Sequence, residues 1–202
     1  MNVEKIEILK PNVRVVELTL IGDSPLISHA WSDKARKMMA DKQQKKAKRA
    51  KAKRDPKAEY EASLYKHPAG GYAMPAMSFK QAAVNACRLV DGIPMTRAKM
   101  LFHVVGDWVA IDGKPQMRED MVRLETGVAD IRYRGEFTAW RCVIQVRYHA
   151  DSMSADQLVN LFDAAGFGSG IGDWRPQKGG SFGMFHVATA DELGQQILEA
   201  AE

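Results

Sequence analysis

The stretch WRCVIQVRY at residues 140–148 is the strongest structural signal in this 202-residue chain. Apolar residues occupy every second position, and those that share the apolar face are Trp140, Cys142, Ile144, Val146 and Tyr148. Side chains of a strand point alternately to its two faces, so the pattern predicts a strand with one buried face. Residues 13–21, VRVVELTLI, alternate in a similar way and predict a second strand.

Two amphipathic segments predict helices that cover such a sheet. Residues 154–165 begin at the capping residue Ser154, and apolar residues follow at helical spacing until Gly166. Residues 78–90 contain FKQAAVNACRLV, which has one apolar face. Thr189 with Glu192 forms the pattern of a capping box, which predicts a terminal helix that reaches about residue 201.

The remaining apolar runs complete the order of elements. Residues 101–111 predict a strand, or a hairpin around Gly106-Asp107, and residues 182–187 predict a last strand. The resulting order, strand-helix-strand-strand-helix-strand, is typical of the α+β ferredoxin-like and RNA-recognition folds. We therefore expect one domain over residues 1–202, with insertions at about 24–77 and 112–139. Residues 114–138 are polar and are expected to be irregular.

Charge is concentrated in one segment. Residues 32–54 hold eleven of the 29 basic residues and two of the 25 acidic ones, a net charge of +9, which leaves −5 for the rest of the chain. This segregation points to a polyanionic partner, most often nucleic acid. We call residues 32–54 the basic segment.

The basic segment is rich in helix-forming residues and has almost no apolar stripe after Met39, so an exposed helical arm is expected. An amphipathic membrane helix needs an apolar face, which disfavours a membrane partner. A solvated arm without a partner and an arm that binds an acidic protein are the alternatives. The candidate phosphate-binding residues are Lys34, Arg36, Lys37, Lys42, Lys45, Lys46, Lys48, Arg49, Lys51, Lys53 and Arg54.

A glycine-rich loop, GFGSGIGDWRPQKGGSFG, occupies residues 166–183. It lacks the G-x-G-x-x-G spacing and lies between a helix and a strand, and the chain contains no phosphate-loop motif, so both nucleotide-binding motifs are excluded. What remains is flexible backbone, with an aromatic residue and two cations, that suits single-stranded nucleic acid. The candidate residues are Gly168, Gly170, Gly172, Trp174, Arg175 and Lys178. The alternative is a structural loop whose tryptophan packs on the body of the protein.

A third candidate is an arginine cluster. Arg132 and Arg134 lie in the second insertion, and Arg141 and Arg147 lie on the polar face of the strand at 140–148. The open face of an RNA-recognition sheet is where bases stack. The alternative is ion pairing with Glu125, Asp130 and Glu136.

Catalysis finds little support in the sequence. The five histidines have no metal-ligand spacing, and no nucleophile or paired-carboxylate signature is present, so we expect neither metal nor cofactor nor enzymatic activity. One alternative remains open: His29 could act as a general acid/base in RNA cleavage, although the sequence does not supply a partner for it. Cys87 and Cys142 lie in apolar patterns and are expected to be buried thiols in a reducing cytoplasm.

The core order, the loop GFGSGIGDWRPQKGGSFGMF and the two insertions resemble the RAMP superfamily, the RNA-binding proteins of CRISPR effector complexes. The insertion pattern is most similar to the backbone subunits, in which the insertion between the middle strands acts as a thumb. The segments SPLISHAWSDKA, YAMPAMSFKQAAVNACRLVDG, MVRLETGVADIRYRGEFTAWR and GIGDWRPQKGGSFGMFHV also resemble a bacteriophage protein family.

The resemblance implies a non-enzymatic protein that binds single-stranded nucleic acid, with RNA preferred, and oligomerises along the strand. Other subunits of a nucleoprotein complex are possible partners, and the setting is the cytoplasm of a bacterium or of a phage host. Two alternatives stay open. One is a phage accessory protein of recombination that binds or anneals single-stranded DNA, and the other is a metal-independent ribonuclease.

Overall fold

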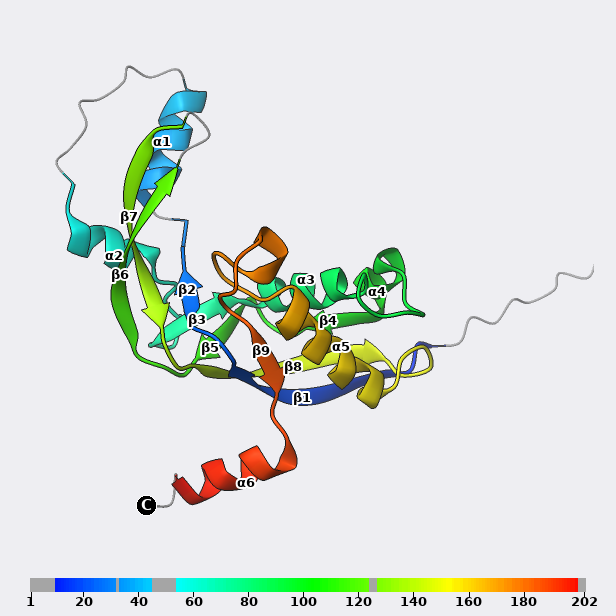
Figure 1. Cartoon of the computed structure of the whole chain (residues 1–202). Coiled ribbons are helices and arrows are strands. Elements are labelled where there is room, and N and C mark those ends of the chain that lie inside the picture. The colour runs from blue at the N-terminus through cyan, green and yellow to red at the C-terminus, as the bar shows by residue number, and fades with distance from the viewer. Residues whose placement is uncertain (1–9, 32, 45–53, 124–126, 200–202) are drawn as a thin grey trace, which may run out of the picture.

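The computed structural model describes residues 10–31, 33–44, 54–123 and 127–199, and its centre is a four-stranded antiparallel sheet (Figure 1). In spatial order the strands are β4 (Phe102–Val104), β8 (Arg141–His149), β1 (Val13–Gly22) and β9 (Phe185–Val187). Helices α3 (Ala76–Ala86) and α5 (Ala155–Gly168) cover one face. The connectivity β1-α3-β4-β8-α5-β9 confirms the α+β class with a ferredoxin-like βαββαβ core.

The alternation in β8 and β1 places the core as the sequence predicts. Leu18 lies opposite Ile144 and Leu20 opposite Cys142, and all four side chains are buried beneath the helices. On the other face of the sheet, Val143 remains 51 % exposed. Burial of each large side chain contributes about 1.5–3 kcal/mol, so the register that buries one whole face is strongly favoured.

The helix ends follow local rules. Ser154 Oγ accepts a hydrogen bond from the Gln157 amide at 3.1 Å, and Gln157 Oε1 accepts one from the Ser154 amide at 2.9 Å, which is a complete capping box. Thr189 and Glu192 form the predicted box of α6 (Ala190–Glu199), with the Thr189 amide 2.8 Å from Glu192 Oε2. Helix α5 ends at Gly168 and not before Gly166, and α6 extends away from the sheet (Figure 1).

The predicted strand at 101–111 is divided in the structure. Strand β4 joins the central sheet, whereas β5 (Trp108–Ile111) pairs with β3 (Tyr72–Pro75) in a separate two-stranded sheet. The chain changes direction at Gly106, whose φ of +84° is accessible to glycine without strain. Helix α4 (Met95–Leu101), which precedes β4, is not predicted from the sequence.

The insertion after β1 contains β2 (Leu26–Ser28), α1 (Asp33–Gln43), α2 (Pro56–Ser63) and β3. Helix α1 covers the first half of the basic segment, and residues 45–53 lie outside the described residues. Asp55 caps α2 by accepting a hydrogen bond from the Ala58 amide at 3.1 Å.

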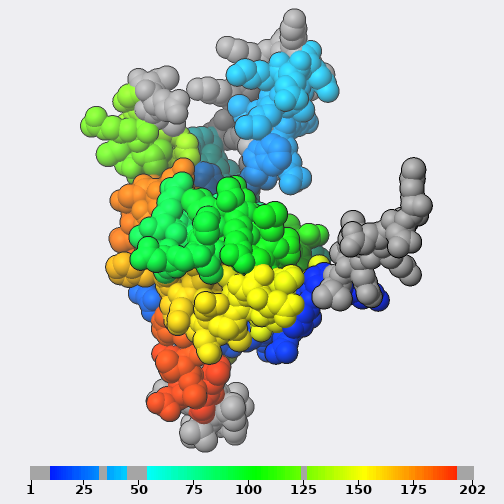
Figure 2. Space-filling model, turned by 90° about the vertical axis from the view of Figure 1, so that its right-hand side faces the viewer, coloured from blue at the N-terminus to red at the C-terminus, as the bar shows by residue number. Residues whose placement is uncertain are grey.

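The expectation of irregular structure at 114–138 was wrong. The segment forms a β-hairpin of β6 (Pro115–Arg123) and β7 (Ala129–Phe137), and with β2 it builds a three-stranded sheet in the order β2-β7-β6. The pattern of apolar residues does not predict these strands, because their buried positions include Asp120, Arg134 and Glu136, which form ion pairs. The hairpin and α1 project together from one end of the molecule, and α6 lies at the opposite end (Figure 2).

Candidate nucleic-acid interface

A cleft of about 480 Å³ opens between α3 and the glycine-rich loop. Helix α3 contributes Gln81 and Asn85, and the loop contributes Ser169, Asp173 and Arg175. The connector that leads from β2 into the basic segment completes the rim with His29. A cleft of this size lies within the usual range for sites that hold a small molecule or one nucleotide.

The loop packs on itself and makes backbone hydrogen bonds to β2 and to the residue before it. The Gly183 amide donates to the Pro25 carbonyl at 2.8 Å, and the Asp173 amide donates to the Ile27 carbonyl at 2.9 Å. At Gly183, where φ is +65°, a Cβ would lie 1.9 Å from the Ile171 carbonyl oxygen. Glycine is therefore required here by close internal packing, independently of any ligand.

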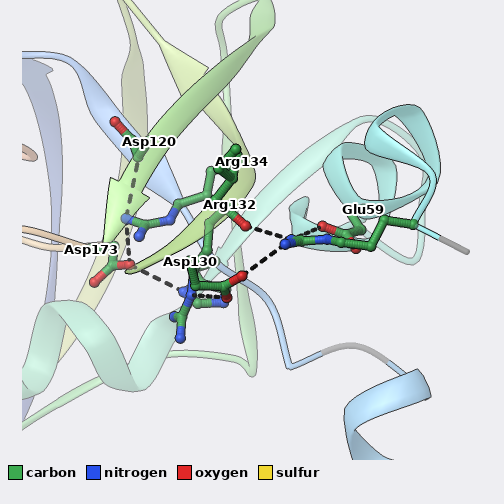
Figure 3. A network of polar contacts seen from close by, with 9 residues as sticks. Glu59, Asp120, Asp130, Arg132, Arg134 and Asp173 are labelled. Carbon is green, nitrogen blue, oxygen red and sulfur yellow. Dashed lines mark hydrogen bonds and ion pairs between the residues drawn. The ribbon is translucent and has the colours of Figure 1, made fainter. Parts of the chain in front are cut away.

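A buried arginine joins the loop to the hairpin (Figure 3). Arg134 is 2 % exposed, and its Nη1 lies 2.9 Å from Asp173 Oδ2 and 4.0 Å from Asp120 Oδ2. Burial lowers the pKa of the Arg134 guanidinium, while the two carboxylates act to raise it. The pKa of Asp173 lies below its ordinary value, chiefly through its hydrogen bond with His29 and also through the charge of Arg134, although burial opposes both.

Trp174 is part of this junction. It is the one residue other than glycine with a positive φ, +53°, among the residues that the structure describes. Its ring lies 4.7 Å from the Arg134 guanidinium and 5.6 Å from that of Arg118, and its centroid is 6.0 Å from that of Phe182. The alternative that the sequence left open, a tryptophan packed on the body of the protein, is thus the arrangement found.

The arginines of the hairpin also make internal ion pairs. Arg118 contacts Asp120 at 2.8 Å and Glu136 at 2.6 Å, and Arg132 lies 4.0 Å from Asp130. In Figure 3, Arg134 lies between Asp120 and Asp173, and Arg132 lies beside Asp130. Ion pairing therefore describes Arg118, Arg132 and Arg134, and of these three Arg132 is the most exposed, with 36 % of its side chain accessible. Arg141 pairs with Asp112 at 2.7 Å, and Arg147 is exposed on β8.

The basic segment is placed only in part. Arg36 lies 5.0 Å from the centre of the Trp31 ring, and Lys37 and Lys42 are exposed on α1. Arg54 binds Glu59 at 2.6 Å and Asp130 at 2.8 Å, so it anchors the end of the segment to the hairpin. The Lys34 side chain lies outside the described residues, as do Lys45, Lys46, Lys48, Arg49, Lys51 and Lys53.

Of the candidate residues in the glycine-rich loop, some line the cleft and others do not. Arg175 lies at the cleft and donates to the Gly172 carbonyl at 2.9 Å and to Gln177 at 3.1 Å. Gly170 and Gly172 line it, whereas Gly168 ends α5 and Lys178 ends the short 3₁₀ helix Pro176–Lys178. Sequence reasoning missed Asn85 and Ser169, although a polar residue within the apolar run AAVNAC of α3 was a usable signal.

The structure also supplies the partner that the sequence lacked for His29. Its Nδ1 lies 3.1 Å from Asp173 Oδ2, at the rim of the cleft. No group of three or more His, Cys, Asp or Glu side chains within the described ranges is arranged to hold a metal ion. In the same part of the chain, no helix is long and apolar enough to cross a bilayer.

Comparison with known proteins adds one structural likeness. No protein-family model matches the sequence, and no curated protein matches it. Among solved structures, 29 chains match, and one of them is the crystal structure of Cmr6 from Pyrococcus furiosus. The two chains are 7 % identical, the match covers 88 % of this chain and 99 % of that one, and the TM-score is 0.46. The fold assignment rests on the connectivity and sheet order described above.

Proposed function

We propose that this protein binds single-stranded nucleic acid, with RNA preferred, without acting on it chemically. The observation that carries the proposal is the position of the cleft at the foot of the basic segment. His29 lines the cleft, and three residues later the segment with a net charge of +9 begins. A nucleic-acid strand that is bound along the basic segment would therefore reach a cleft of nucleotide size.

The two parts make different contributions to binding. Lys and Arg side chains neutralise phosphates and release counterions, which gives affinity that depends strongly on salt and hardly on sequence. The cleft, with a volume of about 480 Å³, admits one unstacked nucleotide and excludes a duplex. We therefore expect single strands to bind more tightly than duplexes of the same length and charge density.

Assembly along the strand is part of the proposal. The hairpin and α1 project from one end of the molecule (Figure 2), which leaves them free to reach a neighbouring copy on the same strand. Copies that bind side by side predict an affinity per nucleotide that rises with strand length and complexes of regularly increasing mass. Native mass spectrometry on strands of 15, 30 and 60 nucleotides measures both.

The direct test is fluorescence anisotropy with a labelled RNA 30-mer, the same DNA sequence and the corresponding duplexes, at several salt concentrations. The basic-segment variant carries glutamine at Lys42, Lys45, Lys46 and Lys48. A matched control neutralises four exposed cations elsewhere: Lys10, Arg97, Lys99 and Lys114. Each phosphate contact that is lost should reduce the slope of log K against log salt by about 0.7 for single strands.

We expect the basic-segment variant to lose at least tenfold in affinity while the control stays within twofold of the native protein. Equal losses in both variants, or binding by the native protein that does not respond to salt, would overturn the proposal. A clear preference for DNA together with accelerated pairing of complementary strands would instead assign the phage annealing function.

A metal-independent ribonuclease is the second candidate, because His29 and Asp173 form a dyad at the cleft. A carboxylate on Nδ1 fixes the imidazole orientation and leaves Nε2 to take the proton from a ribose 2′-hydroxyl. Attack of that oxygen on phosphorus would then break the bond to the 5′-oxygen, which takes a proton from water and leaves as a 5′-hydroxyl, and would yield a 2′,3′-cyclic phosphate. Products with such ends, abolished in His29→Ala while binding persists, would establish this activity; intact RNA after prolonged incubation would remove it.

A further inference from the structure

Two polar groups in the cleft have no partner within the described residues. Ser169 is 2 % exposed, and its Oγ makes no hydrogen bond, and the same holds for the buried Nδ2 of Asn85. Leaving a buried donor or acceptor unpaired costs about 1–3 kcal/mol, so such groups are uncommon in folded proteins. Both residues line the cleft, so these two unpaired atoms lie beside the space that a ligand would fill.

Both groups are held in place by their surroundings. The Asn85 Oδ1 accepts a hydrogen bond from Gln81 Nε2 at 3.0 Å, so the amide NH₂ of Asn85 remains as the available donor. Ser169 is the C-terminal cap of α5: its amide donates to the Ala165 carbonyl at 3.0 Å, and its carbonyl accepts from the Gln177 amide at 3.2 Å. The site therefore offers one donor and one hydroxyl in fixed positions, before any ligand binds.

The walls of the cleft select the chemical class of the ligand. Met74, Ala82 and Ile171 line it and are each at most 3 % exposed, and Met77 at the rim is 66 % exposed. Apolar walls with a few polar groups suit a planar heteroaromatic ring. The carboxylate of Asp173 also lines the cleft, and its Oδ2 is paired with the buried Arg134 guanidinium at 2.9 Å. A cation, Arg175, is available beside it, fixed by its hydrogen bond to the Gly172 carbonyl.

We infer that the cleft holds one unstacked nucleobase, with its hydrogen-bonding edge toward Asn85 and Ser169 and its phosphate near Arg175. The inference rests on the proposed function and extends it from charge recognition to base recognition. The protein would then recognise one base at a fixed position, and it would bind the rest of the strand independently of its sequence.

Free mononucleotides test the cleft independently of the basic segment. The probes are AMP, GMP, CMP and UMP at millimolar concentration, with ribose 5-phosphate and inorganic phosphate as base-free controls. Backbone amide NMR signals of the full chain around residues 81–85 and at Ser169 should shift with at least one nucleotide and not with the base-free compounds. Equal shifts with ribose 5-phosphate would overturn the inference, because they would place a phosphate in the cleft.

The variants Ser169→Ala and Asn85→Ala separate a ligand-binding role from a structural one. If the groups serve a ligand, Ser169→Ala should keep or raise thermal stability, because it removes an unpaired buried hydroxyl. The double variant should weaken nucleotide binding by about tenfold, at about 0.5–1.5 kcal/mol for each lost hydrogen bond. Ser181→Ala, which replaces an exposed hydroxyl outside the cleft lining, is the matched control and should change neither quantity. A clear loss of stability in Ser169→Ala with unchanged binding would refute the inference.

Polymers distinguish this inference from the proposed function. An RNA 15-mer is compared with an analogue that carries hydrogen in place of every base. Weaker binding of the analogue, with the same salt slope, supports the base site. Equal, salt-sensitive binding of both overturns the base site and leaves the proposed function intact, whereas no binding of either polymer overturns the proposed function itself.

Discussion

Replacement of Arg134 by methionine tests the junction between the hairpin and the glycine-rich loop. Methionine keeps much of the side-chain length and removes the charge, so Asp173 and Asp120 lose the cation 2.9 and 4.0 Å away. Removal of one partner from a buried ion pair typically costs about 3–5 kcal/mol. Asp173 is 32 % exposed and keeps its contact with His29, which places the expected loss near the lower end, at about 3 kcal/mol.

Chemical denaturation monitored by far-UV circular dichroism measures this loss, and a thermal scan should show a decrease in Tm of about 6–12 °C for a chain of this size. Arg132→Met is the matched control on the same strand. Arg132 is 36 % exposed and its nearest carboxylate oxygen is 4.0 Å away, so the control should lose less than about 0.5 kcal/mol. A double-mutant cycle of Arg134→Met with Asp173→Asn should give a coupling of about 1–2 kcal/mol.

A loss below about 1 kcal/mol for Arg134→Met, or additive effects in the cycle, would refute the reasoning. Either result would mean that the loop keeps its position through its backbone contacts alone. The guanidinium would then be replaceable, and the hairpin and the loop would be energetically independent.

Three further outcomes follow from described contacts. Gly183→Ala should lower the free energy of unfolding by about 3 kcal/mol or more, because its Cβ would lie 1.9 Å from a carbonyl oxygen. In the control Gly70→Ala, φ is +103° and no atom lies within 4 Å of the Cβ, so thermal unfolding should show a loss of only about 1 kcal/mol. Burial opposes protonation of His186, but contacts with two carboxylates raise its pKa above 6.5. The contribution of protonated His186 to the free energy of unfolding is therefore complete below pH 6.5 and is lost as the pH rises through the raised pKa. The stability difference between the native protein and His186→Ala should accordingly shrink in alkaline buffer. Cys87 and Cys142 are buried and burial raises the pKa of both thiols, so a thiol reagent at neutral pH should modify neither in the native state and both in guanidinium chloride; rapid native labelling would contradict this.

The core could be read from the sequence because its signal is local. Alternation in β8, the serine cap of α5 and the Thr189 box each depend on residues a few positions apart, and the structure has all three. The two cysteines also lie buried, as their apolar patterns predict. The hairpin was missed because its buried positions are charged, and the neutralising partners of Arg134 lie on another strand and in the loop.

The candidate site divides along the same line. Composition alone locates the basic segment, since charge is a property of the residue and not of its neighbours. The cleft needed the tertiary structure, because Asn85 on α3 and Ser169 at the end of α5 are 84 positions apart in sequence and line one surface only after both helices pack on the sheet. The same holds for His29 and Asp173, whose contact spans 144 positions. The sequence thus determined the βαββαβ core and the place of the positive charge, and only the packing of distant segments decided that the glycines serve internal contacts and that a nucleotide-sized cleft opens where the basic segment begins.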